Sequence, residues 1–260
     1  MTAAPRPSPE ECKVLPAGAL RDRFAVVTGA GSGIGRAVTL RLVELGASVM
    51  GVGRRAERLA ETAALAGHRF TYRALDIRHE PPDFLAELAE LDLLVNNAGG
   101  QFIAPAAEIS RRGFDAVLDL NLTAQAALLQ AARPGLAARG GRVVNLSLSA
   151  PDRGIPGLVH SAAARAGIAA LTRSLARQWP AIKLFCLAPG TVLTAGVGEE
   201  LPPEELAGIV ERTPLGRDTS LDEVAEWVAA LGCGIADAVS GALIEVDGGS
   251  GLVAAAALAG

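Results

Sequence analysis

Apolar runs of strand length alternate with stretches of helical spacing along the whole chain. The runs of strand length are residues 24–28, 48–52, 70–75, 91–95, 142–146, 182–187 and 242–246. Helical spacing is found at 34–45, 82–89, 114–138, 162–178 and 221–231, and in a stretch through Glu57 and Leu65. Strands that recur between helices indicate βαβ units. The pattern predicts an α/β fold with a doubly wound parallel sheet and helices on both faces.

The length of 260 residues suits one α/β domain, and no linker interrupts the alternation. Residues 1–22 are rich in proline and polar groups and are predicted to be a flexible N-terminal arm, with the domain at 23–260. The arm lacks the apolar core of a signal peptide. The apolar tail 251–260 is too short to cross a bilayer, so we expect it to pack on the domain or on another subunit.

Charge and cysteine content exclude several classes of function. The net charge is −4 and no basic cluster is present, which argues against a nucleic-acid surface. No segment predicts membrane insertion. Three cysteines without metal-like spacing favour a reducing, cytoplasmic location and predict no metal site.

A glycine-rich turn separates the first predicted strand from the first predicted helix. Residues without side chains allow backbone N–H groups and the helix N-terminus to approach a pyrophosphate. Glycine would also suit an ordinary tight turn, but its place between strand and helix favours nucleotide binding and a Rossmann-like sheet. The predicted contacts are Gly29, Gly31, Ser32, Gly33, Ile34 and Gly35.

The second predicted strand ends in Arg54 and Arg55, with no acidic residue between Ser48 and Ala56. An acidic side chain there would bind the ribose 2′-hydroxyl, whereas arginine accommodates a 2′-phosphate. The cofactor is therefore predicted to be NADP rather than NAD, with Arg54 as the main contact. The alternative is that both arginines are simply solvated.

Three motifs together resemble the short-chain dehydrogenase/reductase superfamily. They are Thr-Gly-x-x-x-Gly-x-Gly at 28–35, Asn-Asn-Ala-Gly at 96–99 and Val-Asp-Gly-Gly at 246–249. The resemblance implies that Asp76 and Ile77 contact adenine, although a plain turn aspartate is an equal alternative. It also places two further segments at the cofactor: Asn97, Ala98 and Gly99 beneath the adenosine, and Pro189, Gly190, Val192 and Thr194 at the nicotinamide.

The family's catalytic Tyr-x-x-x-Lys pair and upstream serine have no intact equivalent here. One alignment puts Ser161 at the tyrosine, Arg165 at the lysine and Leu148 at the serine, and it preserves the downstream family pattern. The other, one residue earlier, puts His160, Ala164 and Ser147 at those positions. We prefer the first and keep His160 and Ser147 as candidates. Asn121 matches the family's active-site asparagine in both.

Two short segments narrow the resemblance. Gly-Gly-Gln-Phe at 99–102 and His-Ser-x-Ala-Ala-Arg-Ala-Gly at 160–167 are similar to the trans-2-enoyl-CoA reductase branch, a relative of the 2,4-dienoyl-CoA reductases. Reducing a C=C conjugated to a thioester places negative charge on the carbonyl oxygen, where hydrogen-bond donors suffice. Reducing a ketone requires a proton donor as well.

This chemistry assigns roles to the candidate residues. Asn121 and Ser161 are predicted donors to the carbonyl oxygen, with His160 as a further candidate, and Arg165 is predicted to bind the nicotinamide ribose in place of lysine. Each has a structural alternative: Ser161 as the cap of a helix that begins near Ala162, and His160 as a residue of the loop–helix junction.

Three functions remain open. The first is an NADP(H)-dependent reductase of an α,β-unsaturated thioester or enone, a small-molecule substrate. The second is a degenerate nucleotide-binding member with a non-redox or scaffold role, and the third a carbonyl reductase or alcohol dehydrogenase. The resemblance also implies a homo-dimer or homo-tetramer, and the polar segment Thr194 to Pro214 resembles a mobile lid.

Overall fold

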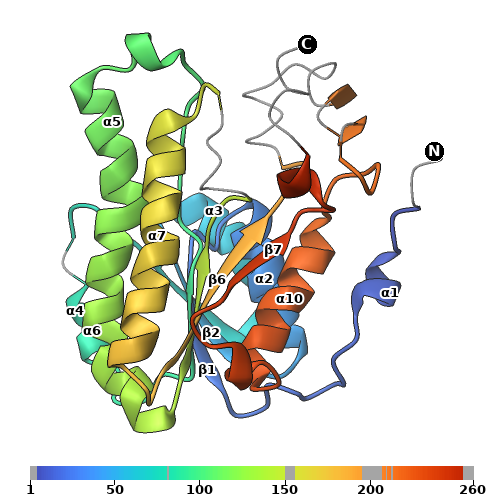
Figure 1. Ribbon diagram of the computed structural model, residues 1–260. Helices are drawn as coiled ribbons and strands as arrows, with labels where there is room; N and C mark the ends of the chain where they lie inside the picture. Colours follow the sequence, from blue (N-terminus) through green and yellow to red (C-terminus); the bar gives the residue numbers. More distant parts are fainter. Residues whose placement is uncertain are drawn as a thin grey trace.

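The computed structural model describes residues 5–80, 82–149, 156–194, 207–208, 210–211 and 213–253. Seven parallel strands form one sheet in the order β3-β2-β1-β4-β5-β6-β7 (Figure 1). This arrangement confirms the predicted doubly wound, Rossmann-like α/β fold. The strands are β1 Phe24–Thr28, β2 Ser48–Gly53, β3 Phe70–Ala74, β4 Leu93–Asn96, β5 Arg142–Leu146, β6 Lys183–Pro189 and β7 Leu243–Val246.

Helices cover both faces of the sheet (Figure 1). One face carries α2 Gly33–Glu44, α3 Ala56–Ala66 and α10 Leu221–Cys233; the other carries α4 Asp83–Ala86, α5 Arg111–Leu118, α6 Ala124–Arg139 and α7 Val159–Gln178. A short helix, α1 Pro9–Cys12, lies against α10. Short 3₁₀ turns occupy Gly67–Arg69, Ala106–Glu108, Asp237–Val239 and Ser250–Leu252. No helix in the described part of the chain is long and apolar enough to cross a membrane.

The central strands are mostly apolar on both sides because each side is buried under helices. In β1, Ala25 and Val27 belong to the core that includes Val38 and Val224, under α2 and α10. Val26 faces the opposite core, built with residues of α6 such as Leu128. Alternate residues of a strand point to opposite faces, so an all-apolar strand fits only a doubly covered sheet.

The chain order reverses between β1 and β4, which are neighbours through the register Val26 to Leu94. Both β2 and β3 lie on one side of β1, and the strands from β4 to β7 lie on the other. Ligands of open α/β sheets bind at the carboxyl ends of the strands beside such a reversal. The fold therefore predicts that a ligand binds at the loops after β1 and β4.

Two helices differ from the sequence prediction. The helix predicted at 114–138 begins at Arg111, and it is interrupted by a π-helical segment at Asp119–Thr123. The helix predicted at 162–178 begins three residues earlier, and the alternative in which Ser161 is its cap was wrong. Helix α7 begins at Val159 after Leu158, which makes no side-chain cap, so both His160 and Ser161 lie within its first turn.

The described part of the N-terminal segment lies against α2 and α10. The backbone N–H groups of Val14 and Leu15 donate to one oxygen of Glu226, at 2.8 and 2.7 Å. The other oxygen of Glu226 accepts from Arg41 Nε at 2.6 Å. A boundary after residue 22 stays a prediction. Residues 254–260 of the tail and most of the segment predicted as a lid lie outside the described residues.

Candidate active site

A cavity of about 280 Å³ opens at the carboxyl ends of β1, β2 and β4, where the fold predicts ligand binding. Its lining includes thirteen of the residues predicted from the sequence to hold the cofactor. They are Gly29, Gly31, Ser32, Gly33, Ile34, Arg54, Arg55, Asp76, Ile77, Asn97, Ala98, Gly99 and Thr194. The structure therefore brings together segments up to 165 residues apart in the sequence, as the nucleotide-site prediction requires.

Glycine is required at this turn, either by the backbone conformation or by close packing of the chain. Gly29 and Gly33 have φ of +70° and +50°, a region that strongly favours glycine. A Cβ on Gly35, which lies beneath the turn, would overlap the carbonyl group of Gly29. The cradle is thus closed to side chains and open to a phosphate group at the N-terminus of α2, which fits a dinucleotide.

The segment after β4 is tied to the end of β1 at the reversal of strand order. Thr28 Oγ1 accepts from the backbone N–H groups of Asn97 and Ala98 at 3.0 and 2.9 Å. Asn97 Nδ2 donates to the Thr28 carbonyl at 2.8 Å. These bonds hold the loop after β4 against the end of β1, so the two sides of the cavity are fixed relative to each other. Thr28 and Asn97 therefore have a structural role beside that of the glycines.

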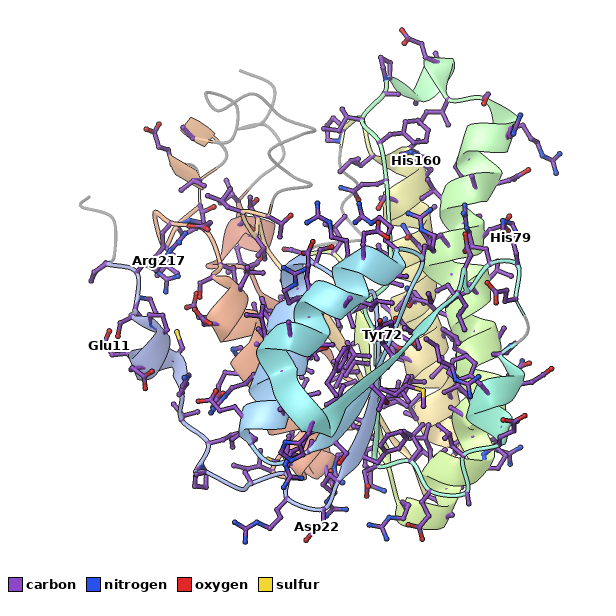
Figure 2. The ribbon with its side chains drawn as sticks, turned by 180° about the vertical axis from the view of Figure 1, so that it is seen from behind. Glu11, Asp22, Tyr72, His79, His160 and Arg217 are labelled. Atoms are coloured by element: carbon purple, nitrogen blue, oxygen red, sulfur yellow. The ribbon has the colours of Figure 1, made fainter. Side chains whose placement is uncertain are left out.

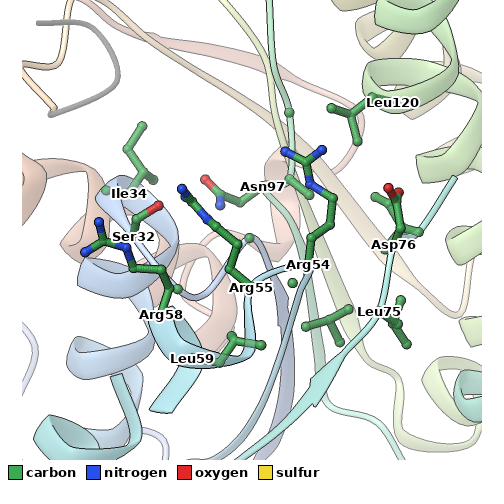
Figure 3. A pocket seen from close by; sticks show the side chains of 18 of the residues that line it. Ser32, Ile34, Arg54, Arg55, Arg58, Leu59, Leu75, Asp76, Asn97 and Leu120 are labelled. Carbon is green, nitrogen blue, oxygen red and sulfur yellow. The ribbon is translucent and has the colours of Figure 1, made fainter. Parts of the chain in front are cut away.

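Three arginines converge on the cavity, one more than the sequence analysis identified (Figure 3). Arg54 and Arg55 form no ion pair among the described residues, so their charges are free to meet an anion. Arg58, four residues after Arg54, lies nearest to Ser32 in Figure 3 and packs against Gly31. It also reaches Glu61 at 3.3 Å, an exposed and weak pair. No local pattern marks it, because Arg54 precedes α3 and the helical i, i+4 spacing does not relate the two residues.

Asp76 is engaged by a neighbouring side chain as well as lining the cavity. Both of its oxygens accept from Arg78 Nε, at 3.0 and 3.2 Å. Hydrogen bonds from Arg78 lower the pKa of Asp76 to about 2, against the opposing effect of burial. Asp76 is therefore an ionised acceptor throughout the physiological range, as either an adenine contact or a turn aspartate would be.

The segment predicted to contact nicotinamide begins at Pro189, the last residue of β6, and packs against Asp247. The Gly190 N–H donates to the Val246 carbonyl at 3.0 Å, and a Cβ on Gly190 would press on Asp247. Asp247, from the Val-Asp-Gly-Gly motif, in turn accepts from Ser149 and from the backbone of Gly249 and Gly251. Pro189, Gly190 and Val192 do not line the cavity described above, and their contact with nicotinamide stays a prediction.

Ser161 and Arg165 lie one turn apart on α7, beside the loop that follows β4. Ser161 is fully buried, and its hydroxyl donates to Gln101 Oε1 at 2.7 Å. Arg165 Nη1 donates to the Leu146 carbonyl at 2.7 Å, and a Cβ on Gly99 would overlap its guanidinium group. Gly99 is thus required by Arg165, a link that no local sequence pattern displays.

Arg165 is a partly buried cation without an anionic partner among the described residues. Burial lowers the pKa of Arg165 to about 10. The group therefore stays protonated at neutral pH although its environment opposes the charge. A desolvated guanidinium group in which only some of the N–H groups are hydrogen-bonded to the protein can bind electron-rich oxygens of a ligand with the others.

Asn121 lies in the π-helical segment and is fully buried. Its Oδ1 accepts from the Gly100 N–H and its Nδ2 donates to the Gly100 carbonyl, both at 2.9 Å. The side chain therefore clamps the loop after β4, and one N–H of the amide remains for a ligand. π-Helical insertions are frequent at functional sites because they turn a side chain out of the helical register.

Like Asn121, Ser161 and Arg165, the two remaining catalytic candidates are not among the residues that line the cofactor cavity. His160 is fully buried, its ring packs edge-on against Phe102 at 4.3 Å between centroids, and neither ring nitrogen has a partner among the described residues (Figure 2). Ser147 donates to the Arg165 carbonyl at 3.2 Å and so ties β5 to α7. The described residues contain no group of three His, Cys, Asp or Glu side chains that could hold a metal ion.

Comparison with known proteins identifies the family. Residues 29–251 match the family model described as "Enoyl-(Acyl carrier protein) reductase". The chain belongs to the short-chain dehydrogenase/reductase superfamily. Among its superfamily relatives, the "Probable 2,4-dienoyl-CoA reductase" of Bacillus subtilis is 32% identical over 250 residues, covering 90% of this chain and 98% of the relative. The superfamily motifs found in the sequence, and the resemblance to the enoyl-CoA reductase branch, are confirmed.

Other superfamily members of comparable similarity carry different activities. The "Cis-4-hydroxycyclohexanecarboxylate dehydrogenase" of Sinomonas cyclohexanicum is 37% identical, with coverage of 89% of this chain and 97% of the relative. A solved structure from Beutenbergia cavernae, proposed to be an NAD(P)-dependent gluconate 5-dehydrogenase and crystallised with NADP, aligns with a TM-score of 0.84. Its identity is 33%, and the alignment covers 90% of this chain and 98% of the other. The chain is therefore similar to oxidoreductases that differ in substrate.

Proposed function

We propose that this oxidoreductase is an NADP(H)-dependent reductase of an α,β-unsaturated thioester or a related enone. One observation carries the proposal: the described residues of the site offer hydrogen-bond donors to a carbonyl oxygen but include no tyrosine or lysine to protonate an alkoxide. The chain has one tyrosine, Tyr72, and it lies half-exposed on the edge strand β3. Its two lysines are equally remote, Lys13 in the N-terminal segment and Lys183 at the start of β6.

The donors have separate tasks in this proposal. NADPH, when bound, would supply the hydride for the β-carbon of the substrate. Ser161 and the free N–H of Asn121 would donate to the thioester oxygen as it gains negative charge, and each such donor contributes about 3–4 kcal/mol. Water would then protonate the α-carbon. Arg165 would bind the ribose hydroxyls and so position the nicotinamide cofactor. Oxidation of NADPH, measured in parallel with an enoyl-CoA and a 3-ketoacyl-CoA, tests the proposal.

The preference for NADPH follows from the arginines of the cavity. Arg54, Arg55 and Arg58 line it with only one weak ion pair among them, and no carboxylate of β2 or its loop lies there to select a 2′-hydroxyl. We expect NADPH to bind at least about tenfold more tightly than NADH, and Arg54→Asp to abolish or reverse this preference. Fluorescence titration of both cofactors measures it. Arg112→Asp, the same charge change on exposed α5, should leave the preference intact; equal affinities in the native chain would refute it.

We also propose a homo-dimer or homo-tetramer built on the outer surfaces of α6 and α7. Exposed alanines such as Ala137, Ala163 and Ala170 leave these surfaces smooth enough for close helix packing. Light scattering at micromolar concentration should give two or four times the chain mass of 26.5 kDa. A single 26.5 kDa species would contradict the assembly.

A reducing, cytoplasmic location accords with the three cysteines, which are all free.

A further inference from the structure

Gln101 makes a partly buried hydrogen bond that the proposed reaction does not yet use. It belongs to the loop after β4, and its Oε1 accepts the Ser161 hydroxyl at 2.7 Å across 60 residues of sequence. Ser161 is fully buried, and the proposed function assigns it to donate to the substrate carbonyl. The partner of that hydroxyl therefore decides where its single proton points.

The backbone on each side of Gln101 is anchored to a helix. Gly100 is held by both polar atoms of the Asn121 amide, at 2.9 Å each. Phe102 packs against the buried ring of His160 in the first turn of α7. Gln101 is thus held between the π-helical segment and α7, so its side chain is directed at Ser161 by fixed neighbours on both sides. This also gives His160 a task, as the surface on which Phe102 rests.

The observed bond leaves Ser161 in the wrong state to stabilise negative charge. A hydroxyl has one proton, and Ser161 donates it to Gln101 in this structure. Ser161 would therefore offer only its lone pairs to a substrate carbonyl. An amide differs from a carboxylate in having a donor at its other end, and the two ends are nearly equal in size. A half-turn of the Gln101 amide would place Nε2 where Oε1 now lies.

We propose that Gln101 is a positioning residue which acts through Ser161. When substrate binds, the amide turns and Nε2 donates a hydrogen bond to Ser161 Oγ. The Ser161 hydroxyl then donates its hydrogen bond to the carbonyl oxygen instead of to Gln101. The two hydrogen bonds polarise each other in series, so the neutral pair stabilises the oxyanion better than serine alone. No proton is transferred in this step. The inference rests on the proposed function, because it needs a substrate carbonyl beside Ser161.

Gln101→Glu tests the direction of the bond, because the shape is kept and the donor is lost. A carboxylate can only accept from Ser161, so turnover near pH 8 should fall about a hundredfold, as for the loss of one oxyanion donor. A protonated carboxyl regains a donor. Since a glutamate has an ordinary pKa near about 4.3, which burial raises, the ratio of variant to native turnover should rise about tenfold as the pH is lowered towards 5.

Gln101→Met is the matched control, since it fills a similar volume without any hydrogen bond. It should lose less, about tenfold, and its ratio to the native chain should not change with pH. Both variants should bind NADPH normally, as Gln101 does not line the cofactor cavity. Unchanged turnover in Gln101→Glu, or the same loss and the same flat ratio in both variants, would overturn the proposal.

The native chain distinguishes this inference from the proposed function. If it reduces a ketone and no enoyl thioester, the proposed function fails, and the same variant ratios measured on the ketone decide the role of Gln101. If it binds NADPH but reduces neither, both proposals fall.

Discussion

Arg165→Ala is expected to lower turnover about a hundredfold or more and to weaken NADPH binding at least about tenfold. Hydrogen bonds from a charged donor contribute about 1.5–3 kcal/mol each, and Arg165 is the partly buried cation proposed to bind the cofactor ribose. Its loss also removes the 2.7 Å bond to Leu146 and leaves a space beside Gly99. Fluorescence titration with NADPH and initial rates on an enoyl thioester measure the two effects separately.

Two further variants control this experiment. Arg165→Lys keeps the charge but offers fewer donors from a different geometry, so it should recover part of the cofactor affinity. Arg173→Ala removes an exposed arginine two turns further along α7 and should change neither quantity. Because the pKa of Arg165 is about 10, its charge should be constant from pH 5 to 8, as should its contribution to binding. Normal affinity and normal turnover in Arg165→Ala would remove it from the site.

An enoyl thioester is expected to be reduced at least about a hundredfold more efficiently, in kcat/KM, than a 3-ketoacyl thioester of the same chain length. General-acid catalysis contributes about 10²–10⁴-fold to reactions that need a proton in the transition state. Neither Tyr72 on β3 nor the two lysines can supply that proton beside Ser161. A conjugated C=C needs only donors to its carbonyl oxygen, and these are present. Initial rates of NADPH oxidation give the ratio; a ratio near one, or a preference for the ketone, would contradict it.

Most of the fold could be predicted from the sequence because each element carries its own pattern. Most positions of β1, β2 and β5 are apolar, and residues on both faces of these strands are buried, which a sheet covered on both faces accommodates. Glycine at Gly29 and Gly33 is demanded by positive φ, so a local backbone need marks the cradle in the sequence itself. Arg54 and Arg55 could likewise be identified from their place after β2.

Other features could not be predicted because they depend on distant partners. The π-helical segment around Asn121 is stabilised by the clamp on Gly100, 21 residues earlier in the chain, and the helical spacing of apolar residues continues through it. The start of α7 at Val159 has no capping side chain, so Ser161 resembled the cap that the sequence otherwise lacked. The Gln101–Ser161 bond and the contact of Arg165 with Gly99 join segments that only the folded sheet brings together.

The central claim, that the site reduces a C=C through donors to a thioester oxygen, is tested most directly by following the hydride. The chain is incubated with an enoyl-CoA and NADPH deuterated at C4, on either face in separate runs, and the acyl product is analysed by mass spectrometry and NMR. The account predicts a saturated acyl-CoA with one deuterium on the β-carbon from one of the two cofactors, and a solvent proton on the α-carbon. NADPH that binds while the enoyl-CoA is recovered unlabelled and unreduced would contradict it.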